Sequence, residues 1–198
     1  MRTLSLTDRP PSSTSRDCRP RKKRVGFFDA LEVTDGTGAD WPHFARWHYR
    51  SHRLGFVKRV FVLWHGPDAV GVCVFSTPAA SLTLRSKFFG LRDPRSGPAL
   101  SALNEQLWLL QRVVLHPTYR GAGVGAAFVR RCCELCPVRW VETLSAMGQA
   151  NPFFERAGFT RVGVIRKPPG RRTAADGSER ERKSRHSEPV YYVFDNRR

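Results

Sequence analysis

A glycine-rich turn headed by an arginine carries the clearest chemistry in the sequence. The run Arg120-Gly121-Ala122-Gly123-Val124-Gly125 directly follows His116-Pro-Thr-Tyr and the apolar segment 107–115. A helix is predicted to begin at about Val124. Because the first amides of a helix have no internal partners and lie at the positive end of its dipole, such a turn binds anions. Glycines let the main chain approach a bulky diphosphate. The turn therefore predicts a diphosphate site, and its spacing differs from both the Walker and the dinucleotide-binding glycine patterns.

A second group of chemically capable residues is the polar and aromatic stretch from Trp47 to Arg53. His48 can act as a general base near neutral pH, and Tyr49 can act as an acid. The alternative interpretation is an amphipathic helix in which Trp47 is buried and His48 and Tyr49 are ordinary boundary residues. His48 and His52 have the i, i+4 spacing of metal ligands on a helix, but two histidines make an incomplete site.

The pattern of apolar residues and turn formers predicts a mixed α/β sheet with one core. Asp40 and Pro42 indicate a helix start, and the β-branched and aromatic segments indicate strands. Residues 77–103 are expected to be irregular because proline and glycine interrupt them. The predicted order is a strand at 27–33, a helix from Trp41 to Tyr49, a hairpin of 58–65 with 70–76, a strand at 107–115, a helix at 124–136, a strand at 138–144, a short helix at 153–157 closed by Gly158, and an antiparallel pair of 159–165 with 190–194.

Composition sets the cellular context and the class of partner. Thirty-four Lys and Arg against 17 Asp and Glu give a net charge of +17, which favours polyanions such as DNA as substrate or partner. We expect a disordered basic tail at residues 1–24, one domain at 25–198 and a mobile basic loop at 166–188. With neither a signal peptide nor a run of 18 apolar residues, the prediction is a cytoplasmic protein without membrane contact. Cys133-x-x-Cys136 lies in an apolar helix, which favours buried thiols over zinc ligands.

Two motifs resemble those of the GNAT (Gcn5-related N-acetyltransferase) superfamily. Residues 113–125 are similar to its motif A, and Asn151-Pro-Phe-Phe-Glu-Arg-Ala-Gly-Phe159 is similar to its downstream motif. The resemblance extends over residues 105–166 and more loosely over 27–104. It implies the GNAT fold, an acyl-coenzyme A donor such as acetyl-CoA, and acyltransferase activity.

The resemblance also implies a role for individual residues. The main chain of Val113, Val114 and Leu115 would pair with the pantetheine arm, and the amides of 120–125 would hold the pyrophosphate. Asn151 would contact the coenzyme near its thiol, although it could equally be a helix N-cap. Phe154 departs from the pattern, because many members have a tyrosine there that protonates the leaving thiolate, and a phenyl ring has no proton to donate.

Bases in GNAT enzymes often come from the strand after the coenzyme helix or the one before it, which makes Glu142 and the following Ser145 catalytic candidates. Glu142 could instead be the ion-pair partner of an arginine, for instance Arg112. Arg112 lies between apolar residues in a predicted strand, and it needs an anionic partner, either a phosphate or a carboxylate.

A narrower resemblance is to the Mom family of bacteriophage DNA-modification proteins. His48-Tyr49, Arg112-Val-Val and the downstream motif carry it. It implies modification of the exocyclic amine of adenine, protection of DNA from restriction, an active site at His48, Tyr49 and Arg112, and iron as a candidate metal. The alternatives are a conventional N-acetyltransferase for a protein or small-molecule amine, and a GNAT fold that binds nucleic acid without catalysis. If the chain is phage-encoded, its compartment is the host cytoplasm.

Overall fold

The computed structural model describes residues 4–5, 27–48, 54–91, 97–166 and 188–197. Within these residues no helix is long and apolar enough to cross a membrane. Of the predicted basic tail, only Leu4–Ser5 are described, and they form a strand that pairs with β2. The rest of the tail, Tyr49, His52 and nearly all of the predicted basic loop lie outside the described residues. The elements are β1 Leu4–Ser5, η1 Phe27–Ala30, β2 Leu31–Gly36, η2 Gly38–Asp40, α1 Trp41–Ala45, β3 Val57–His65, β4 Asp68–Ser76, α2 Thr83–Phe89, α3 Gly97–Gln106, β5 Leu107–Leu115, η3 Pro117–Tyr119, α4 Val124–Glu134, β6 Trp140–Ser145, α5 Phe153–Arg156, β7 Thr160–Val164 and β8 Val190–Asp195.

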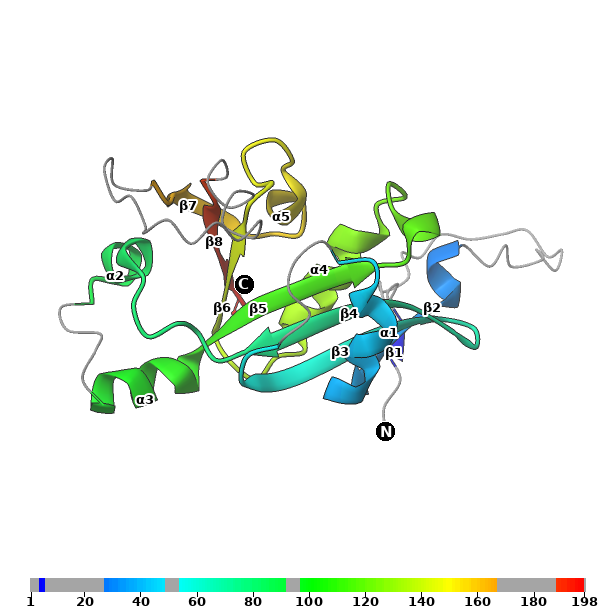
Figure 1. Ribbon diagram of the computed structural model, residues 1–198, viewed down its shortest axis with the longest axis horizontal. Coiled ribbons are helices and arrows are strands. Elements are labelled where there is room, and N and C mark those ends of the chain that lie inside the picture. The colour runs from blue at the N-terminus through cyan, green and yellow to red at the C-terminus, as the bar shows by residue number, and fades with distance from the viewer. Residues whose placement is uncertain (1–3, 6–26, 49–53, 92–96, 167–187, 198) are drawn as a thin grey trace, which may run out of the picture.

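The strands form one mixed sheet in the order β1-β2-β3-β4-β5-β6-β8-β7 (Figure 1). All neighbours are antiparallel except β5 and β6, which run parallel. The prediction of a mixed α/β sheet is confirmed, as are the hairpin β3–β4 and the antiparallel pairing of β7 with β8. Strand β8 lies between β6 and β7, so the last strand of the chain completes the sheet beside β6.

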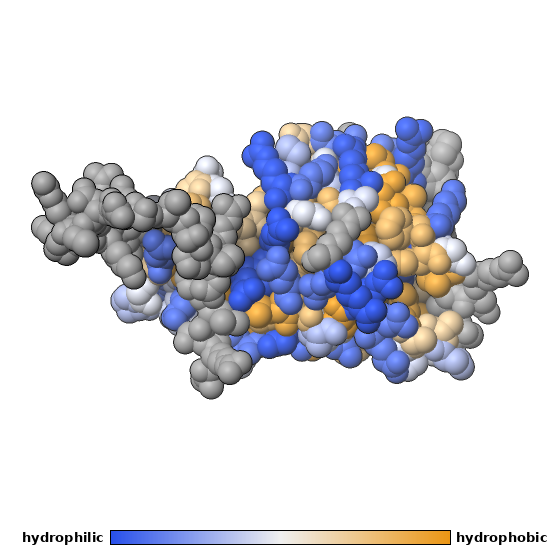
Figure 2. All heavy atoms as spheres, turned by 180° about the vertical axis from the view of Figure 1, so that it is seen from behind, coloured by the Kyte–Doolittle hydropathy of each residue, from blue (hydrophilic) through white to orange (hydrophobic). Residues whose placement is uncertain are grey.

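Helices cover both faces of the sheet. Trp41 and Phe44 of α1 pack over β3, β4 and β5 with valines such as Val72 and Val114. Phe128 and Val129 of α4 pack against the opposite face with Phe61 and other core residues. We call these the α1 face and the α4 face. Figure 2 views the molecule from behind, and it shows hydrophilic residues interspersed with hydrophobic ones on the surface that faces the viewer.

Three sequence predictions need correction. Residues 27–30 form the 3-10 helix η1, and the strand begins only at Leu31. Helix α1 ends at Ala45 instead of continuing to Tyr49. Asp40 stands at its N-cap position without a side-chain capping bond, because its carboxylate accepts from the Thr37 amide at 2.7 Å and caps η2 instead.

The region 77–103 is not irregular, because it contains α2 and most of α3. Gly90, which suggested a loop, adopts a left-handed conformation (φ 65°) as the C-cap of α2. Pro98 lies in the first turn of α3, where its missing amide costs no hydrogen bond. Glycine and proline therefore mark the ends of helices here, and the expectation that they mark an irregular loop was wrong.

The four described cysteines are buried free thiols in the core on the α4 face, which confirms the prediction for Cys133 and Cys136. Burial raises the pKa of the Cys132 and Cys133 thiols well above their usual range, and raises that of Cys136 to about 12. Thiols held protonated in this way pack as small apolar groups, which makes them poor metal ligands and nucleophiles.

Candidate coenzyme site at the fork between β5 and β6

Strands β5 and β6 pair only at their beginnings. The pairing is confined to Leu107–Leu109 with Trp140–Glu142, although β5 continues to Leu115 and β6 to Ser145. Beyond these residues β5 pairs with β4 and β6 pairs with β8. We call the region in which the two strands separate the β5–β6 fork; it leaves one edge of β5 main chain without a strand neighbour. A bulge at Gln111, where the register with β4 shifts, bends β5 inside the fork.

The wide end of the fork leads to the glycine-rich turn. Gly121 (φ 86°) and Gly123 (φ 79°) adopt conformations that disfavour other residues, and a Cβ on either would meet nothing within 4 Å. The N-cap of α4 is Gly123, and no side chain caps that end of the helix. The first turn of this 11-residue helix therefore has no side-chain cap at its N-cap residue, and the space beside Gly121 and Gly123 is open, which suits the diphosphate of a coenzyme.

Gly125 has a different role from the other two glycines. A Cβ there would lie 2.9 Å from Phe153 Cε2 and 3.0 Å from Leu115 Cδ1. The absence of a side chain thus lets α4, α5 and the end of β5 pack closely, and fixes the direction of α4 relative to the fork.

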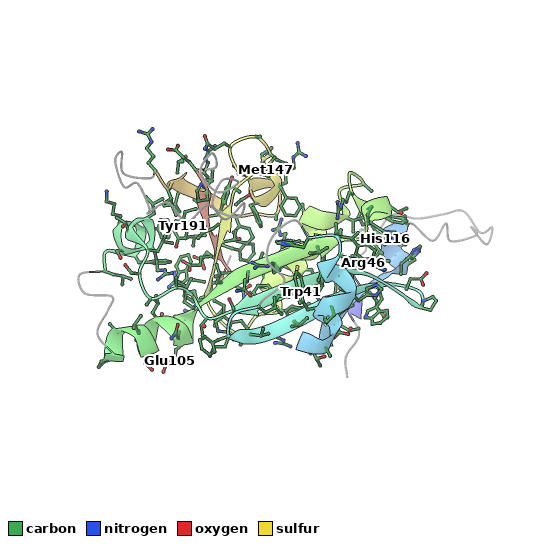
Figure 3. All side chains as sticks on the ribbon, in the orientation of Figure 1. Trp41, Arg46, Glu105, His116, Met147 and Tyr191 are labelled. Atoms are coloured by element: carbon green, nitrogen blue, oxygen red, sulfur yellow. The ribbon has the colours of Figure 1, made fainter. Side chains whose placement is uncertain are left out.

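The Arg120 side chain turns back from the diphosphate site. Its Nε donates to the Leu115 carbonyl at 3.1 Å, and its Nη2 donates to the Trp47 carbonyl at 3.4 Å. Trp47 also meets the His116 ring edge-on, with centroids 4.7 Å apart. These contacts attach the end of α1 to the turn, so the two predicted site regions are neighbours in the fold. Figure 3 shows His116 and Arg46 together at this end of the molecule.

The predicted acceptor residues are only partly described. His48 follows α1 and meets Trp41 edge-on at 5.7 Å. Tyr49 and His52 lie outside the described residues, so their roles stay predictions. Among the residues that the structure describes, no group of three His, Cys, Asp or Glu side chains could hold a metal ion.

Arg112 and Glu142 lie on the same face of the sheet. Arg112 pairs in register with Val74 of the α1 face, and Glu142 pairs with Leu109, which lies opposite Ser76 on that face. Arg112 Nη1 donates to the Gln111 carbonyl at 2.9 Å. Their shared face borders the fork from the side of α1.

Glu142 is the centre of a buried hydrogen-bonded ion pair. Its partner is Arg85 of α2, and not Arg112: Nε and Nη2 donate to the two carboxylate oxygens at 2.9 and 2.6 Å. Tyr191 also donates to Glu142 Oε2 at 2.9 Å, and Arg85 Nη1 donates to the Ala79 carbonyl at 2.6 Å. Arg85 and Glu142 are only 1% and 2% exposed. This geometry favours the ion-pair interpretation of Glu142 over a general base.

Ser145 and Asn151 lie on the other side of the fork. Ser145 is three residues beyond Glu142 on β6, so its side chain points to the α4 face. The N-cap of α5 is Pro152, and no side chain caps it, so Asn151 is not the N-cap that we considered. Asn151 is exposed at the start of α5, where contact with a coenzyme remains its predicted role.

Phe154 packs into an aromatic group that includes Phe159 and Tyr192, with centroids 5.4 and 5.5 Å away. The Tyr192 hydroxyl shares its one proton between two acceptors, the Gly148 carbonyl at 3.0 Å and Glu155 Oε1 at 3.1 Å. Burial and the bond to Glu155 raise the pKa of Tyr192 to about 12. A phenol so held makes a poor substitute for the missing acid at position 154.

Sequence reasoning missed Arg85, Thr143, Tyr191 and Tyr192. Arg85 stands in a region that was expected to be irregular, so nothing indicated that it would be buried. The two tyrosines stand in a predicted strand, but nothing in the local pattern indicated their hydrogen-bond partners.

The sheet is forked between two parallel strands, and a helix end without a side-chain cap lies at the mouth of the fork. This combination is typical of a protein that binds a diphosphate-bearing coenzyme with an extended arm. Residues 57–161 match the acetyltransferase (GNAT) domain family, and the chain belongs to that family. The match includes the fork, the glycine-rich turn and α5.

One curated protein resembles the chain in sequence, and two solved structures resemble it in fold. The chain is 33% identical over 109 residues to glucosamine 6-phosphate N-acetyltransferase of Trypanosoma brucei brucei, covering 54% of the chain and 61% of the relative. The fold resembles a structure of AAC(6')-Ib in complex with paromomycin and acetyl-CoA, with a TM-score of 0.50 and 17% identity over 84% of this chain and 94% of that one. It also resembles a spermidine N-acetyltransferase SpeG chimera from Vibrio cholerae and hSSAT, with a TM-score of 0.50 and 11% identity over 84% and 96%.

Proposed function

We propose that the protein is an acyl-coenzyme A-dependent N-acyltransferase that acts on the amine of an anionic acceptor. One observation carries the proposal: the β5–β6 fork opens directly onto the uncapped amino end of α4. This arrangement offers unpaired strand main chain for a pantetheine arm and free amides for a diphosphate, at the two places where such a coenzyme needs them.

The coenzyme supplies an acyl group activated as a thioester. The chain's own residues bind and orient it: the amides of 121–125 hold the diphosphate, and the free edge of β5 at 113–115 aligns the arm. The acceptor then approaches from the α1 face, where His48 and Arg112 lie. Arg112 offers a fixed positive charge for an anionic acceptor, and His48 offers a base for its ammonium proton.

Two facts support an anionic acceptor. The net charge of +17 attracts anions and repels polyamines. The relative from Trypanosoma brucei brucei is named for an amino sugar that bears a phosphate. A phosphorylated small molecule with a free amine is therefore the acceptor class that we favour.

Calorimetry with coenzyme A and acetyl-CoA tests the donor side. Gly123→Val places a side chain in the open space above the turn, and should weaken coenzyme A binding about tenfold to a hundredfold by displacing charge-assisted amide bonds. Gly66→Val is a matched control, because Gly66 also has a positive φ (58°) and open surroundings but lies in the β3–β4 turn. Equal affinities of both variants and the wild type would contradict the proposed site.

Thiol release from acetyl-CoA, measured with a panel of acceptors, tests the reaction. Glucosamine 6-phosphate, its unphosphorylated form and spermidine separate phosphate-dependent from charge-independent acceptance. We expect turnover with the phosphorylated amine and little with spermidine. Coenzyme A binding without turnover on any acceptor would favour the non-catalytic interpretation.

The charge also favours a second candidate, modification of the exocyclic amine of adenine in DNA by a Mom-like reaction. A base within a duplex must first be flipped out, at a cost of roughly a few kcal/mol, and the basic chain would supply binding energy through phosphate contacts. Mass spectrometry of nucleosides from co-expressed plasmid DNA tests this function. Unmodified deoxyadenosine in the presence of folded protein would exclude it.

A further inference from the structure

A side chain bridges the narrow end of the β5–β6 fork. The Thr143 hydroxyl of β6 donates to the Leu110 carbonyl of β5 at 3.0 Å, one residue beyond the last main-chain pairing of the two strands. Thr143 is 3% exposed and Leu110 is 2% exposed. The bond is a final rung that joins the strands where their main chains begin to separate.

Strand β6, which carries Thr143, is fixed in position by contacts on both faces of the sheet. Glu142, the neighbour of Thr143, is fixed by Arg85 and Tyr191 on the α1 face. Arg85 belongs to α2, whose Phe89 also meets Trp140 of β6 edge-on at 5.2 Å. On the α4 face, Leu110 and Val141 lie in the closed core. Strand β6 therefore cannot move away from β5 at this point without breaking a buried ion pair, and the narrow end of the fork is closed.

The position of this end matches the reach of the coenzyme arm. A strand rises about 3.3 Å per residue, so the five residues from Leu115 to Leu110 span roughly 16 Å. A pantetheine arm that starts at the diphosphate site and follows β5 extends over a comparable length. Its thioester would then lie near Leu110 and Thr143, with the acyl group directed at the closed end.

We propose that Thr143 is a specificity-determining residue that, together with Leu110, limits the donor to short acyl groups and favours acetyl. This inference rests on the proposed coenzyme site. Its physical basis is that a close-packed, fully buried wall has no room for additional methylenes. A chain that exceeds the limit should weaken binding roughly tenfold or more in total.

Calorimetric titration of acetyl-, butyryl- and hexanoyl-coenzyme A, with free coenzyme A as reference, tests the proposal. The wild type should bind hexanoyl-CoA at least about tenfold more weakly than acetyl-CoA. Thr143→Ala removes two side-chain atoms from the wall and should reduce that ratio several-fold. Thr143→Val keeps the volume and loses the hydroxyl, so the ratio should stay near that of the wild type. Thr160→Ala, at an exposed position of β7, is the matched control and should change nothing.

The outcomes separate the two levels of the argument. If free coenzyme A does not bind the folded wild type, the coenzyme site and this inference both fail. If coenzyme A binds and all acyl lengths bind equally, only the acyl-length inference is overturned. If the wild type discriminates and a folded Thr143→Ala variant discriminates equally, the limit exists but Thr143 does not set it, which also overturns the assignment. Thermal unfolding of each variant establishes folding, and Thr143→Ser provides a milder loss of volume.

Discussion

The buried ion pair between Arg85 and Glu142 yields the sharpest stability prediction. The two side chains are 1% and 2% exposed and share two hydrogen bonds of 2.6 and 2.9 Å. Removing one partner leaves a buried charge without compensation, so Arg85→Met should destabilise the fold by about 3–5 kcal/mol. Replacing both partners by apolar residues of similar volume avoids that charge, and typically restores or exceeds the original stability.

Tyr191 modifies the size of this effect. Its hydroxyl donates to Glu142, so the double variant Arg85→Met/Glu142→Met leaves a buried hydroxyl without that acceptor, at a cost of about 1–3 kcal/mol. Adding Tyr191→Phe removes the cost. The expected order of stability is therefore the triple variant above the double, and the double above Arg85→Met alone.

Urea unfolding, followed by tryptophan fluorescence, measures these differences because Trp140 lies beside α2. A loss below about 1 kcal/mol for Arg85→Met would refute the reasoning, since it would show the pair to be solvated. The same variants address catalysis. If Glu142 is structural, the double and triple variants keep acyl-transfer activity, whereas loss of activity in a stable triple variant would restore Glu142 as the base.

Three further predictions follow from the packing and the pKa values. Gly125→Ala should lower stability by about 1–3 kcal/mol, because its Cβ would lie 2.9 Å from Phe153; a melting temperature equal to that of the wild type would contradict the close packing. Ultraviolet titration should place one phenol near pH 12, that of Tyr192, and Tyr192→Phe should remove it. Because a raised pKa means that folding holds the proton, this group's contribution to stability should be complete below about pH 10 and be lost as pH rises towards 12. A thiol reagent should modify the described cysteines only after unfolding, namely Cys73, Cys132, Cys133 and Cys136. Rapid labelling of these residues in the native protein would contradict their burial.

Much of the coenzyme side of the site could be predicted from the sequence. The run 107–115, the glycine-rich turn and the helix from Val124 are contiguous, and local rules suffice for such features: apolar strands, glycine conformations and helix ends. For the same reason Gly158 was correctly expected to end the short helix α5, with φ 94°. The family assignment rests on these local motifs as well.

The sequence by itself thus determined most of the strands, the turn and the class of coenzyme, because each depends on residues that are close together in the chain. The position of β8 beside β6 depends on residues about 45 positions apart, and only the tertiary structure decided it. Only the tertiary structure decided what Glu142 does. Its partners Arg85 and Tyr191 are 57 and 49 residues away, and the hydroxyl of Thr143 meets a carbonyl 33 residues away. The partner of the buried Glu142 carboxylate depends on how α2 packs against the sheet. Side-chain contacts between residues so far apart in the chain leave no periodic pattern in a single sequence. The donor site could therefore be found from local spacing, whereas the closed end of the fork emerged only when distant strands and α2 were packed together.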